Sequence, residues 1–342
     1  MSGGVDSSVV AGLLHGQGHE VIGVTLQLYD AAAGRKGACC AGQDIHDARD
    51  VADRLGIAHY VIDAEARFRA SVIQQFADAY AGGETPVPCV RCNMGVKFTD
   101  LLQLARDLGA DAMATGHYVR RVEGADGPEL HRAADPARDQ SWFLFATTRA
   151  QLAYSMFPLG EMADKGVVRD HAARMGLAVA AKPDSQDLCF VPDGRYADLV
   201  QRLRPDATVA GEVVSQDGRV LGTHGGVARF TVGQGRGLGP ASFDGGVRQA
   251  VLAVDARRRR VVVGPRDAGG RTVRLREVNW LVPPGELACT VKLRARDGLR
   301  DAVVRPAGDG AVVELAEPAL AAAGQACVFY DGSRVLGGGF IA

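Results

Sequence analysis

Hydrophobic and polar positions follow two different patterns in the two parts of this chain. Up to about residue 190, short apolar runs typical of buried strands alternate with stretches whose apolar residues recur at helical spacing. The strand-like runs are 20–26, 58–63 and 110–116, and the helical stretches include 47–55 and 98–108. This alternation predicts an α/β fold with a parallel, doubly wound sheet.

After residue 192 the pattern changes to short β-branched runs separated by Gly, Asp and Pro, as in 211–222 and 259–266. Such runs are typical of small β-rich domains. A Gly-Gly turn at 269–270 indicates a further division near residue 268. We therefore predict three domains: a nucleotide-binding α/β domain over 1–191, a small central β-rich domain over 192–267 and a C-terminal β-rich domain over 268–342.

Composition narrows the class of protein. The 342 residues are 47% hydrophobic and 23% charged, enough to bury substantial cores, and the net charge of −1 means that any nucleic-acid contact must use local basic patches. No apolar run approaches the roughly 20 residues that span a bilayer, and no signal peptide is recognisable at the N-terminus. We expect a cytoplasmic protein with no membrane partner, whose seven scattered cysteines are thiols.

The chain opens with a candidate phosphate loop, Met1-Ser-Gly-Gly-Val-Asp-Ser-Ser. Adjacent glycines allow backbone amides to turn toward phosphate oxygens, the serines add hydroxyl donors, and a helix expected to begin near Ser7 directs its positive end at the anion. No Gly-Lys-Ser/Thr follows, so this is not a Walker loop; it resembles the loop of ATP pyrophosphatases, which cleave between the α and β phosphates. Asp6 is expected to help place Mg²⁺. The alternative is a strand-to-helix turn without a ligand.

Such a loop normally follows a buried strand, whereas one residue precedes it here. We expect that the start codon was assigned too late and that a first strand is missing. The alternative is a sheet that begins with what is ordinarily its second strand.

Three cysteines form a second candidate site. Cys89 and Cys92 precede a helical segment expected to start near residue 93, and a helix N-terminus together with Arg91 or Lys97 favours the thiolate. Cys189 ends the α/β region, where chain order returns it toward the ligand-binding edge of the sheet, so the three thiols are predicted to converge. A structural zinc site is disfavoured because no second Cys-x-x-Cys is present.

Several strings together resemble the tRNA-specific 2-thiouridylase family, which makes 2-thiouridine at the anticodon wobble position. Besides the phosphate loop they are Thr85-Pro-Val-Pro with Cys92-Asn and Lys97-Phe, Ala114-Thr-Gly-His-Tyr, Asp139-Gln-Ser-Trp-Phe-Leu, Asp184-Ser-Gln-Asp-Leu-Cys-Phe, and Gly324-Gln-Ala-Cys-Val-Phe-Tyr with Leu336-Gly-Gly-Gly. The resemblance covers nearly the whole chain. It implies an N-terminal nucleotide-binding domain of the ATP pyrophosphatase type, a small central domain and a C-terminal β-barrel.

The resemblance also implies residue roles. Cys92 corresponds to the nucleophile and Cys189 to the cysteine that carries persulfide sulfur. The residues implied to contact ATP are Ser2, Gly3, Gly4, Val5, Asp6, Ser7, Ser8, Leu26 and Gly116. Those implied to contact tRNA are His117, Arg138, Asp139, Gln140, Arg294 and Gln325, with Val87, Pro88 and Cys89 beside the target base. Many family members carry Asp at the position of Cys89.

The implied reaction uses ATP and Mg²⁺ to adenylate O2 of uridine 34 in glutamate, glutamine and lysine tRNAs, and then replaces this oxygen with sulfur. The sulfur comes from a donor such as a cysteine desulfurase or a sulfur-relay protein. In one route Cys189 carries a persulfide that Cys92 resolves, closing a disulfide or releasing hydrosulfide. In the other, Cys89, Cys92 and Cys189 hold a [4Fe-4S] cluster whose fourth iron binds hydrosulfide.

Two rival functions share some of these features. Another ATP pyrophosphatase-type ligase acting on a small molecule would use the same loop without needing Cys92 and Cys189. A non-catalytic RNA-binding protein would use the arginine-rich tail, which includes Arg257-Arg-Arg-Arg, to follow phosphates; a solvated strand face explains the same arginines. ATP-to-AMP turnover and dependence on cysteine separate the three functions.

Overall fold

The computed structural model describes residues 1–29, 40–184, 188–191 and 195–342. The chain divides into two compact units. The first comprises Met1–Val72, Cys89–Gly194 and Ser333–Val335; the second comprises Ile73–Pro88, Arg195–Gly332 and Leu336–Ala342. Each unit therefore contains segments that are distant in the sequence.

The first unit contains two separate pairs of parallel strands together with helices, which confirms the predicted α/β class. Strand β1 (Ile22–Gln27) pairs with β2 (Ala58–Asp63), with Ile22 opposite Ala58. Strand β3 (Met113–Ala114) pairs with β6 (Ser155–Met156). Among the described residues no strand is hydrogen-bonded to both pairs. Of the predicted strand 110–116 only Met113 and Ala114 join a ladder.

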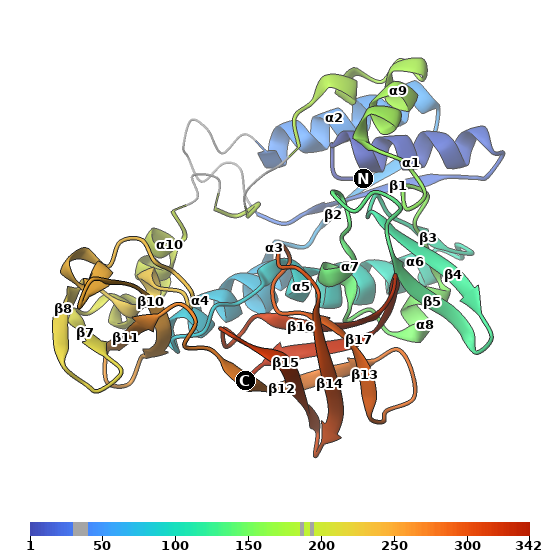
Figure 1. The fold of residues 1–342 in the computed structure, drawn as a ribbon. Coiled ribbons are helices and arrows are strands. Elements are labelled where there is room, and N and C mark those ends of the chain that lie inside the picture. The colour runs from blue at the N-terminus through green and yellow to red at the C-terminus, as the bar shows by residue number, and fades with distance from the viewer. Residues whose placement is uncertain (30–39, 185–187, 192–194) are drawn as a thin grey trace. The chain divides into compact units, whose positions relative to one another are not determined.

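Helix α2 (Cys40–Leu55) packs against both strands of the β1–β2 pair, α1 (Val5–Gly16) packs against α2, and α9 (Lys165–Arg174) packs against α1 (Figure 1). Their apolar faces meet in one core, in which Val9 of α1, Val51 of α2 and Val168 of α9 are all buried. The predicted helical spacing over 47–55 is thus confirmed as the inner face of α2.

The remaining helices and strands of the first unit are short. The helices are α3 (Glu65–Phe68), the π-helix η1 (Arg69–Ile73, which continues into the second unit), α5 (Pro88–Cys92), the π-helix η2 (Asn93–Leu101), α6 (Leu102–Asp107), α7 (Ser141–Leu144), α8 (Arg149–Ala153) and the 3₁₀-helix η3 (Ala178–Ala181). Strands β4 (Val119–Gly124) and β5 (Gly127–Arg132) form an antiparallel hairpin.

The helix expected from near residue 93 begins earlier. It starts at Pro88, and proline suits the first position of a helix because it has no N–H to leave unsatisfied. α5 then continues directly into η2 and α6, so that Cys89 and Cys92 lie within the helical run and not ahead of it. In η2, Thr99 Oγ1 donates to Met94 O, five residues earlier, at 2.7 Å.

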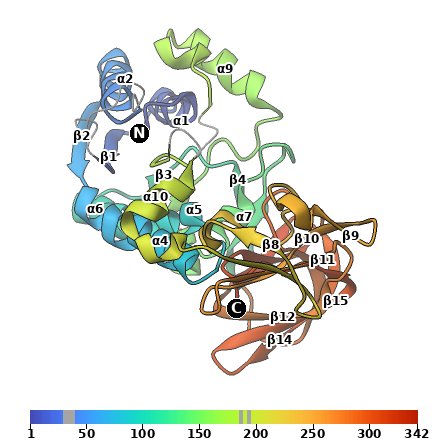
Figure 2. The ribbon, with the colours of Figure 1, turned by 90° about the vertical axis from the view of Figure 1, so that its left-hand side faces the viewer.

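The second unit begins with two helices, α4 (Gln74–Ala81) and α10 (Tyr196–Leu203), that lie side by side (Figure 2). The rings of Tyr80 and Tyr196 stack between them with centroids 4.7 Å apart. Short 3₁₀ turns follow at η4 (Pro205–Thr208), η5 (Val227–Arg229) and η6 (Gly239–Ser242).

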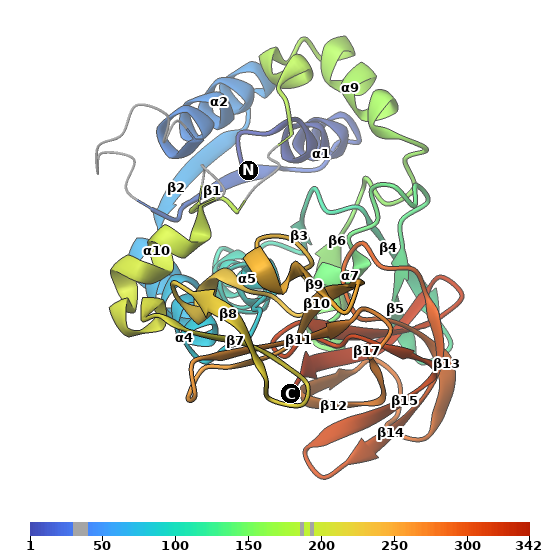
Figure 3. The same cartoon turned by 60° about the vertical axis from the view of Figure 1, so that its left-hand side comes forward.

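The central β-rich part of this unit is one five-stranded sheet in the order β8-β7-β11-β10-β9. Its strands are β7 (Gly211–Ser215), β8 (Val220–His224), β9 (Phe243–Asp244), β10 (Val247–Asp255) and β11 (Arg260–Pro265) (Figure 3). Val213, Val251, Val261 and Val263 are buried against Phe230 in its core. The predicted β-rich character of this central part of the chain is confirmed.

The C-terminal strands close into a six-stranded barrel. They are β12 (Gly270–Trp280), β13 (Leu287–Lys292), β14 (Arg300–Ala307), β15 (Gly310–Ala319), β16 (Ala326–Asp331) and β17 (Arg334–Ile341). The strand order is β12-β15-β14-β13-β16-β17, and β17 returns to pair with β12. Alternate residues such as Val313 and Leu315 fill the interior, as the two-residue period of a strand requires. The implied C-terminal β-barrel is confirmed.

Within the part of the chain described above, no helix combines the length and the apolar character that crossing a bilayer requires.

Candidate active site

The phosphate loop has the backbone that its glycines predict. Gly3 lies in the left-handed region at φ 68°, and a Cβ there would come within 2.2 Å of Asp44 O, so only glycine fits. Ser8 Oγ donates to Gly4 O at 2.9 Å, and Ser7 Oγ accepts from Ser2 N at 3.0 Å. Helix α1 begins directly after Gly4 without a side-chain cap, so no side chain satisfies its first amides. Uncapped amides at a helix start suit a phosphate group.

Two further residues with implied ATP roles lie on strands or strand ends of the same unit. Gly116 packs against the loop, where a Cβ would lie 3.0 Å from both Asp6 Cβ and Ser7 N. Leu26 is near the carboxyl end of β1, the end at which parallel sheets bind ligands. The close approach at Gly116 explains why this position requires glycine.

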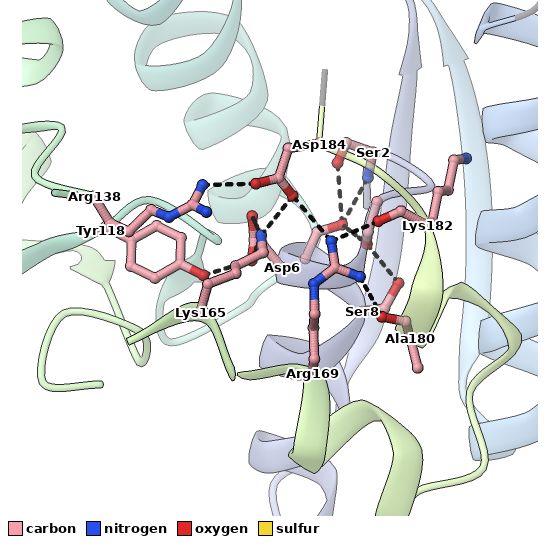
Figure 4. Close-up of polar contacts among 12 residues, drawn as sticks. Ser2, Asp6, Ser8, Tyr118, Arg138, Lys165, Arg169, Ala180, Lys182 and Asp184 are labelled. Atoms are coloured by element: carbon pink, nitrogen blue, oxygen red, sulfur yellow. Dashed lines mark hydrogen bonds and ion pairs between the residues drawn. The ribbon is translucent and has the colours of Figure 1, made fainter. Parts of the chain in front are cut away.

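A lysine from α9 reaches the loop (Figure 4). Lys165 follows the N-cap residue Asp164, and its Nζ lies 2.6 and 2.8 Å from the two oxygens of Asp6 and 2.9 Å from Asp184 Oδ1. Tyr118 Oη donates to Asp6 Oδ1 at 2.7 Å. Burial and the adjoining Asp6 carboxylate raise the pKa of Tyr118 well above its ordinary value. Tyr118 is therefore a neutral donor, and Lys165 is the cation that balances Asp6.

Asp184 is shared by several cations. Arg138 Nη1 lies 2.6 Å from Oδ2, and Arg169 Nη2 lies 3.7 Å from Oδ1, beside Lys165. Burial opposes the ionisation of Asp184, but the hydrogen bonds and charges of Lys165 and Arg138 outweigh it and lower the pKa of this carboxyl. Asp184 is therefore an anion at neutral pH.

A second lysine ties the loop to α2. Lys182 Nζ donates to Gly3 O at 2.9 Å, lies 2.6 Å from Asp44 Oδ1 and pairs with Asp47. Burial alone would lower the pKa of Lys182, but its bonds to Asp44 and Asp47 raise it. Arg169 fixes the same segment by donating to Ala180 O and Lys182 O at 2.6 and 2.8 Å. The segment that leads toward Cys189 is thus bound to the phosphate loop.

Sequence reasoning missed the residues of this charged network. They are Asp44, Asp47, Tyr118, Lys165, Arg169 and Lys182. Each is more than 35 positions from the loop, and nothing in their spacing signals the contact. Lys182 was the most accessible to inference, since it stands two residues before the Asp184 string.

The three cysteines of the second candidate site are free thiols in the first unit, with Cys92 buried and with Cys89 and Cys189 exposed. Desolvation by the surrounding protein raises the pKa of all three, that of Cys189 to about 12. The charge of Cys92 raises the pKa of Cys89 and of Cys189, and Cys89 also acts on Cys189. The three thiols are therefore electrostatically coupled.

The expectation that the helix start and a nearby cation favour the thiolates is wrong, because the pKa of each thiol is raised and not lowered. Lys97 does lower the pKa of each thiol, but desolvation is the larger influence on all three. For Cys92 the physical reason is the early start of the helix, which places this residue inside it and buries its side chain.

The described residues contain no group of three or more His, Cys, Asp or Glu side chains arranged to hold a metal ion. The described residues therefore give no support to an iron–sulfur cluster at Cys89, Cys92 and Cys189. The string from Asp184 to Phe190 includes Ser185, Gln186 and Asp187, which lie outside the described residues.

Known proteins resemble this chain over its full length. The family model described as tRNA methyl transferase HUP domain matches residues 1–193, the tRNA methyl transferase PRC-barrel domain matches 197–265, and the Aminomethyltransferase beta-barrel domain matches 270–341. A tRNA-specific 2-thiouridylase MnmA from Acidiphilium cryptum is 67% identical over 345 residues, covering 100% of this chain and 98% of the relative. The chain belongs to the tRNA-specific 2-thiouridylase family.

Two other relatives support the same membership. The tRNA-specific 2-thiouridylase MnmA of Gluconobacter oxydans is 65% identical, with coverage of 100% of this chain and 97% of the relative. That of Rhodospirillum centenum is 60% identical, with coverage of 100% and 90%. The resemblance drawn from the sequence strings is thus confirmed.

Among the positions that the resemblance implies for tRNA contact, Arg138, Asp139 and Gln140 of the first unit have internal partners. Asp139 is 3% exposed, and its carboxylate accepts from Arg132 Nε, Ala133 N, Ser141 N and Ser141 Oγ at 3.0–3.2 Å. Gln140 Oε1 accepts from Tyr118 N at 2.9 Å, and Arg138 pairs with Asp184. Asp139 and Gln140 thus position the chain between β5 and α7.

His117 also belongs to this set. Its Nδ1 is bonded to Thr115 Oγ1 at 2.9 Å, and its ring lies 6.0 Å from that of Phe98. Desolvation, and secondarily the charge of Lys97, lower the pKa of His117 well below its ordinary value. His117 is therefore neutral at physiological pH.

The remaining positions of this set lie in the second unit. Val87 and Pro88 are buried there. Arg294 donates to Val232 O at 2.6 Å, and Gln325 donates through Nε2 to Thr85 O at 2.9 Å. Arg276 forms a bidentate pair with Glu84 at 2.9 and 2.6 Å. The barrel thus holds the strand-like segment 84–88 that leads into α5.

Proposed function

We propose that this protein is an ATP-dependent tRNA sulfurtransferase that converts uridine 34 to 2-thiouridine. The observation that carries the proposal is the presence, in one structural unit, of an uncapped phosphate loop and three electrostatically coupled free thiols. The loop serves adenylation and the thiols serve sulfur transfer, and the two steps together make 2-thiouridine.

Adenylation comes first because the uracil C2 carbonyl has no leaving group. O2 attacks the α-phosphate of ATP, the bond between the α and β phosphates breaks, and pyrophosphate leaves. The amides at the start of α1 suit the developing charge on pyrophosphate, and Mg²⁺ adds to this stabilisation. Asp6 is the carboxylate of the loop that is placed to hold Mg²⁺, once the cation competes with Lys165 for its oxygens.

Sulfur transfer then uses two cysteines. A sulfur donor, a cysteine desulfurase or a sulfur-relay protein, leaves a persulfide on Cys189, and its terminal sulfur attacks C2 as AMP departs with the original oxygen. The Cys92 thiolate attacks the inner sulfur of Cys189, so that a Cys92–Cys189 disulfide forms and the terminal sulfur stays on the base. An external dithiol reductant afterwards reduces this disulfide. The [4Fe-4S] route is less well supported, because the thiols are not grouped for metal binding among the described residues.

The substrates that we assign are the glutamate, glutamine and lysine tRNAs. Free thiols at the site suit the reducing cytosol, where these tRNAs are found, so we place the reaction there.

The proposal is tested by nucleoside mass spectrometry of unmodified tRNA incubated with ATP, Mg²⁺ and a persulfide donor. We expect 2-thiouridine with the natural protein and none with Cys92→Ser or Cys189→Ser. Cys289→Ser, a substitution of a partly buried cysteine in the barrel strand β13, is the matched control and should retain the product. Thiouridine formation that survives both site substitutions would overturn the assignment of the two cysteines.

The same assay distinguishes the proposed sulfurtransferase from the rival ligase. A ligase that acts on a small molecule would release AMP without tRNA and would be insensitive to both cysteine substitutions. Purification with and without oxygen, followed by iron analysis, separates the two sulfur routes: activity without bound iron supports the persulfide.

A further inference from the structure

A buried lysine lies beside the phosphate loop. Lys165 begins helix α9 directly after Asp164, whose side chain caps the helix by accepting from Val167 N at 3.0 Å. An ammonium group has three N–H donors. Those of Lys165 meet the two oxygens of Asp6 at 2.6 and 2.8 Å and Asp184 Oδ1 at 2.9 Å. The ammonium group is thus turned toward the loop and away from solvent.

The charges of the group around Lys165 do not cancel. Arg138 Nη1 lies 2.6 Å from Asp184 Oδ2, and Arg169 Nη2 lies 3.7 Å from Asp184 Oδ1 (Figure 4). Together with Asp6 the group therefore has three cations and two carboxylates. Within the described ranges, none of the three cations forms an ion pair with a further carboxylate. A partly shielded group with an excess positive charge favours the binding of an anion.

Lys165 is the cation of this group that can change partners. Asp184 keeps Arg138 and Arg169 if the lysine moves. A lysine has a flexible four-carbon stem, so its ammonium group can turn without movement of the backbone. Asp6 then needs another cation, and Mg²⁺ is the cation that the proposed adenylation brings to it. Movement of Lys165 toward an anion therefore leaves no buried carboxylate unpaired.

The anion that fits this place is the phosphate chain of the nucleotide. Asp6 is in the first turn of α1, where no side chain caps the backbone amides, and such amides suit phosphate groups. We infer that Lys165 is a phosphate-binding residue: when Mg²⁺ takes up Asp6, its ammonium group turns to the oxygens of the β and γ phosphates, which leave as pyrophosphate. This inference rests on the proposed function and adds a substrate contact to it.

Nucleotide binding tests the inference without tRNA and without sulfur. The dissociation constants of α,β-methylene-ATP, which cannot be cleaved between its α and β phosphates, and of AMP are measured by calorimetry in the presence of Mg²⁺ with the full chain. In Lys165→Met, which removes the charge and keeps a long side chain, we expect α,β-methylene-ATP to bind about 10- to 100-fold more weakly. AMP lacks the pyrophosphate part and should bind with an unchanged dissociation constant.

The matched control is Arg67→Met. Arg67 pairs with Asp100 at 2.8 Å in the same structural unit and does not touch the loop, so both dissociation constants should stay as in the natural protein. If Lys165→Met alone does not unfold cooperatively, Lys165→Met combined with Asp184→Asn removes the cation together with one of its carboxylates. The same selective loss is expected in this double variant.

The outcomes separate this inference from the proposed function. Equal weakening of both ligands in Lys165→Met would mean that the lysine only holds the loop in place, and unchanged binding of both would mean that it does not reach the phosphates; either result overturns the inference. A natural protein that binds α,β-methylene-ATP no more tightly than AMP would also overturn it. If the natural protein makes no thiouridine while the loss stays selective, the sulfurtransferase function fails and the role of Lys165 stands.

Discussion

Lys165 Nζ lies 2.6 Å from Asp6 Oδ1, although the two residues are 159 positions apart in the sequence. Their side chains are 10% and 31% exposed, so the pair is largely shielded from solvent. The same ammonium group contacts Asp184, in the segment that leads toward Cys189. One lysine thus joins the phosphate loop to the end of the α/β domain.

The Lys165–Asp6 pair should show a measurable coupling free energy. In a double-mutant cycle of Lys165→Met and Asp6→Asn, followed by urea unfolding, we expect each single substitution to destabilise the first unit and the double substitution to cost less than their sum. The expected coupling is about 1–3 kcal/mol, because either single change leaves a shielded charge without its partner.

The control is the pair Arg258–Asp255, at 3.2 Å with Arg258 76% exposed. A coupling of less than about 0.5 kcal/mol is expected there, as for other solvent-exposed pairs. Equal couplings at the two sites would mean that the Lys165 contact is no more than a surface ion pair.

Gly116→Ala should impair nucleotide use while leaving the fold intact. The added methyl group would come within 3.0 Å of Asp6 Cβ and Ser7 N, so the loop must shift. We expect ATP-to-AMP turnover in the presence of tRNA to fall by roughly tenfold, mainly through a higher KM for ATP, because displaced amides no longer match the phosphates. Gly16→Ala, on α1 with open space around the new methyl group, is the control and should keep normal turnover. Equal turnover in both variants would contradict the close packing of Gly116 against the loop.

Asp139→Asn should destabilise the first unit strongly. The carboxylate is 3% exposed and accepts from Arg132, Ala133 and Ser141, so the neutral amide leaves Arg132 without its charge partner and turns one acceptor into a donor. We expect a loss of about 2–4 kcal/mol in urea unfolding.

The control for Asp139 is Asp135→Asn, whose carboxylate accepts from Ala137 N at 2.9 Å at an exposed site. A loss of less than about 1 kcal/mol is expected there. If Asp139→Asn is equally mild but abolishes tRNA binding, Asp139 contacts RNA and its internal bonds are dispensable.

The thiol at Cys189 should react slowly with iodoacetamide at neutral pH despite its exposure. Its pKa is raised from 9.0 to about 12, chiefly by desolvation, so at pH 8 the thiolate is roughly a hundred- to a thousandfold scarcer than in a free thiol. The rate should keep rising up to the highest pH at which the protein stays folded, whereas the rate of a reference thiol is half-maximal near its pKa of about 9 and levels off above about pH 10. An early plateau at Cys189 would show that the thiolate is stabilised at this site.

The same shift makes the fold sensitive to alkaline pH. The folded pKa lies above the unfolded value, so the neutral thiol contributes stability below about pH 9, and this contribution is lost as pH rises toward 12. Cys189→Ser should therefore make the decline of unfolding stability between pH 9 and 11 less steep, as followed by thermal unfolding.

The local pattern of the chain predicted much of the architecture. The helical spacing of 47–55 marked the buried face of α2, and the β-branched runs 211–222 and 259–266 marked the strands β7, β8 and β11, because both patterns follow from local backbone geometry. The start of α5 was missed by five residues. Pro88 is compatible with a turn as well as with a first helical position, and the choice depends on the packing of the residues that follow.

The sequence by itself determined the fold class, the phosphate loop with its required Gly3, and the membership in a family, because these depend on local residue order and on many short strings. Only the tertiary structure decided the partners of Asp6 and Asp184 and the raised pKa of the thiols. Each of these depends on which distant segments exclude water from a side chain and which charges they bring to it. The order of residues along one segment gives no information on water exclusion or on the charges that distant segments bring.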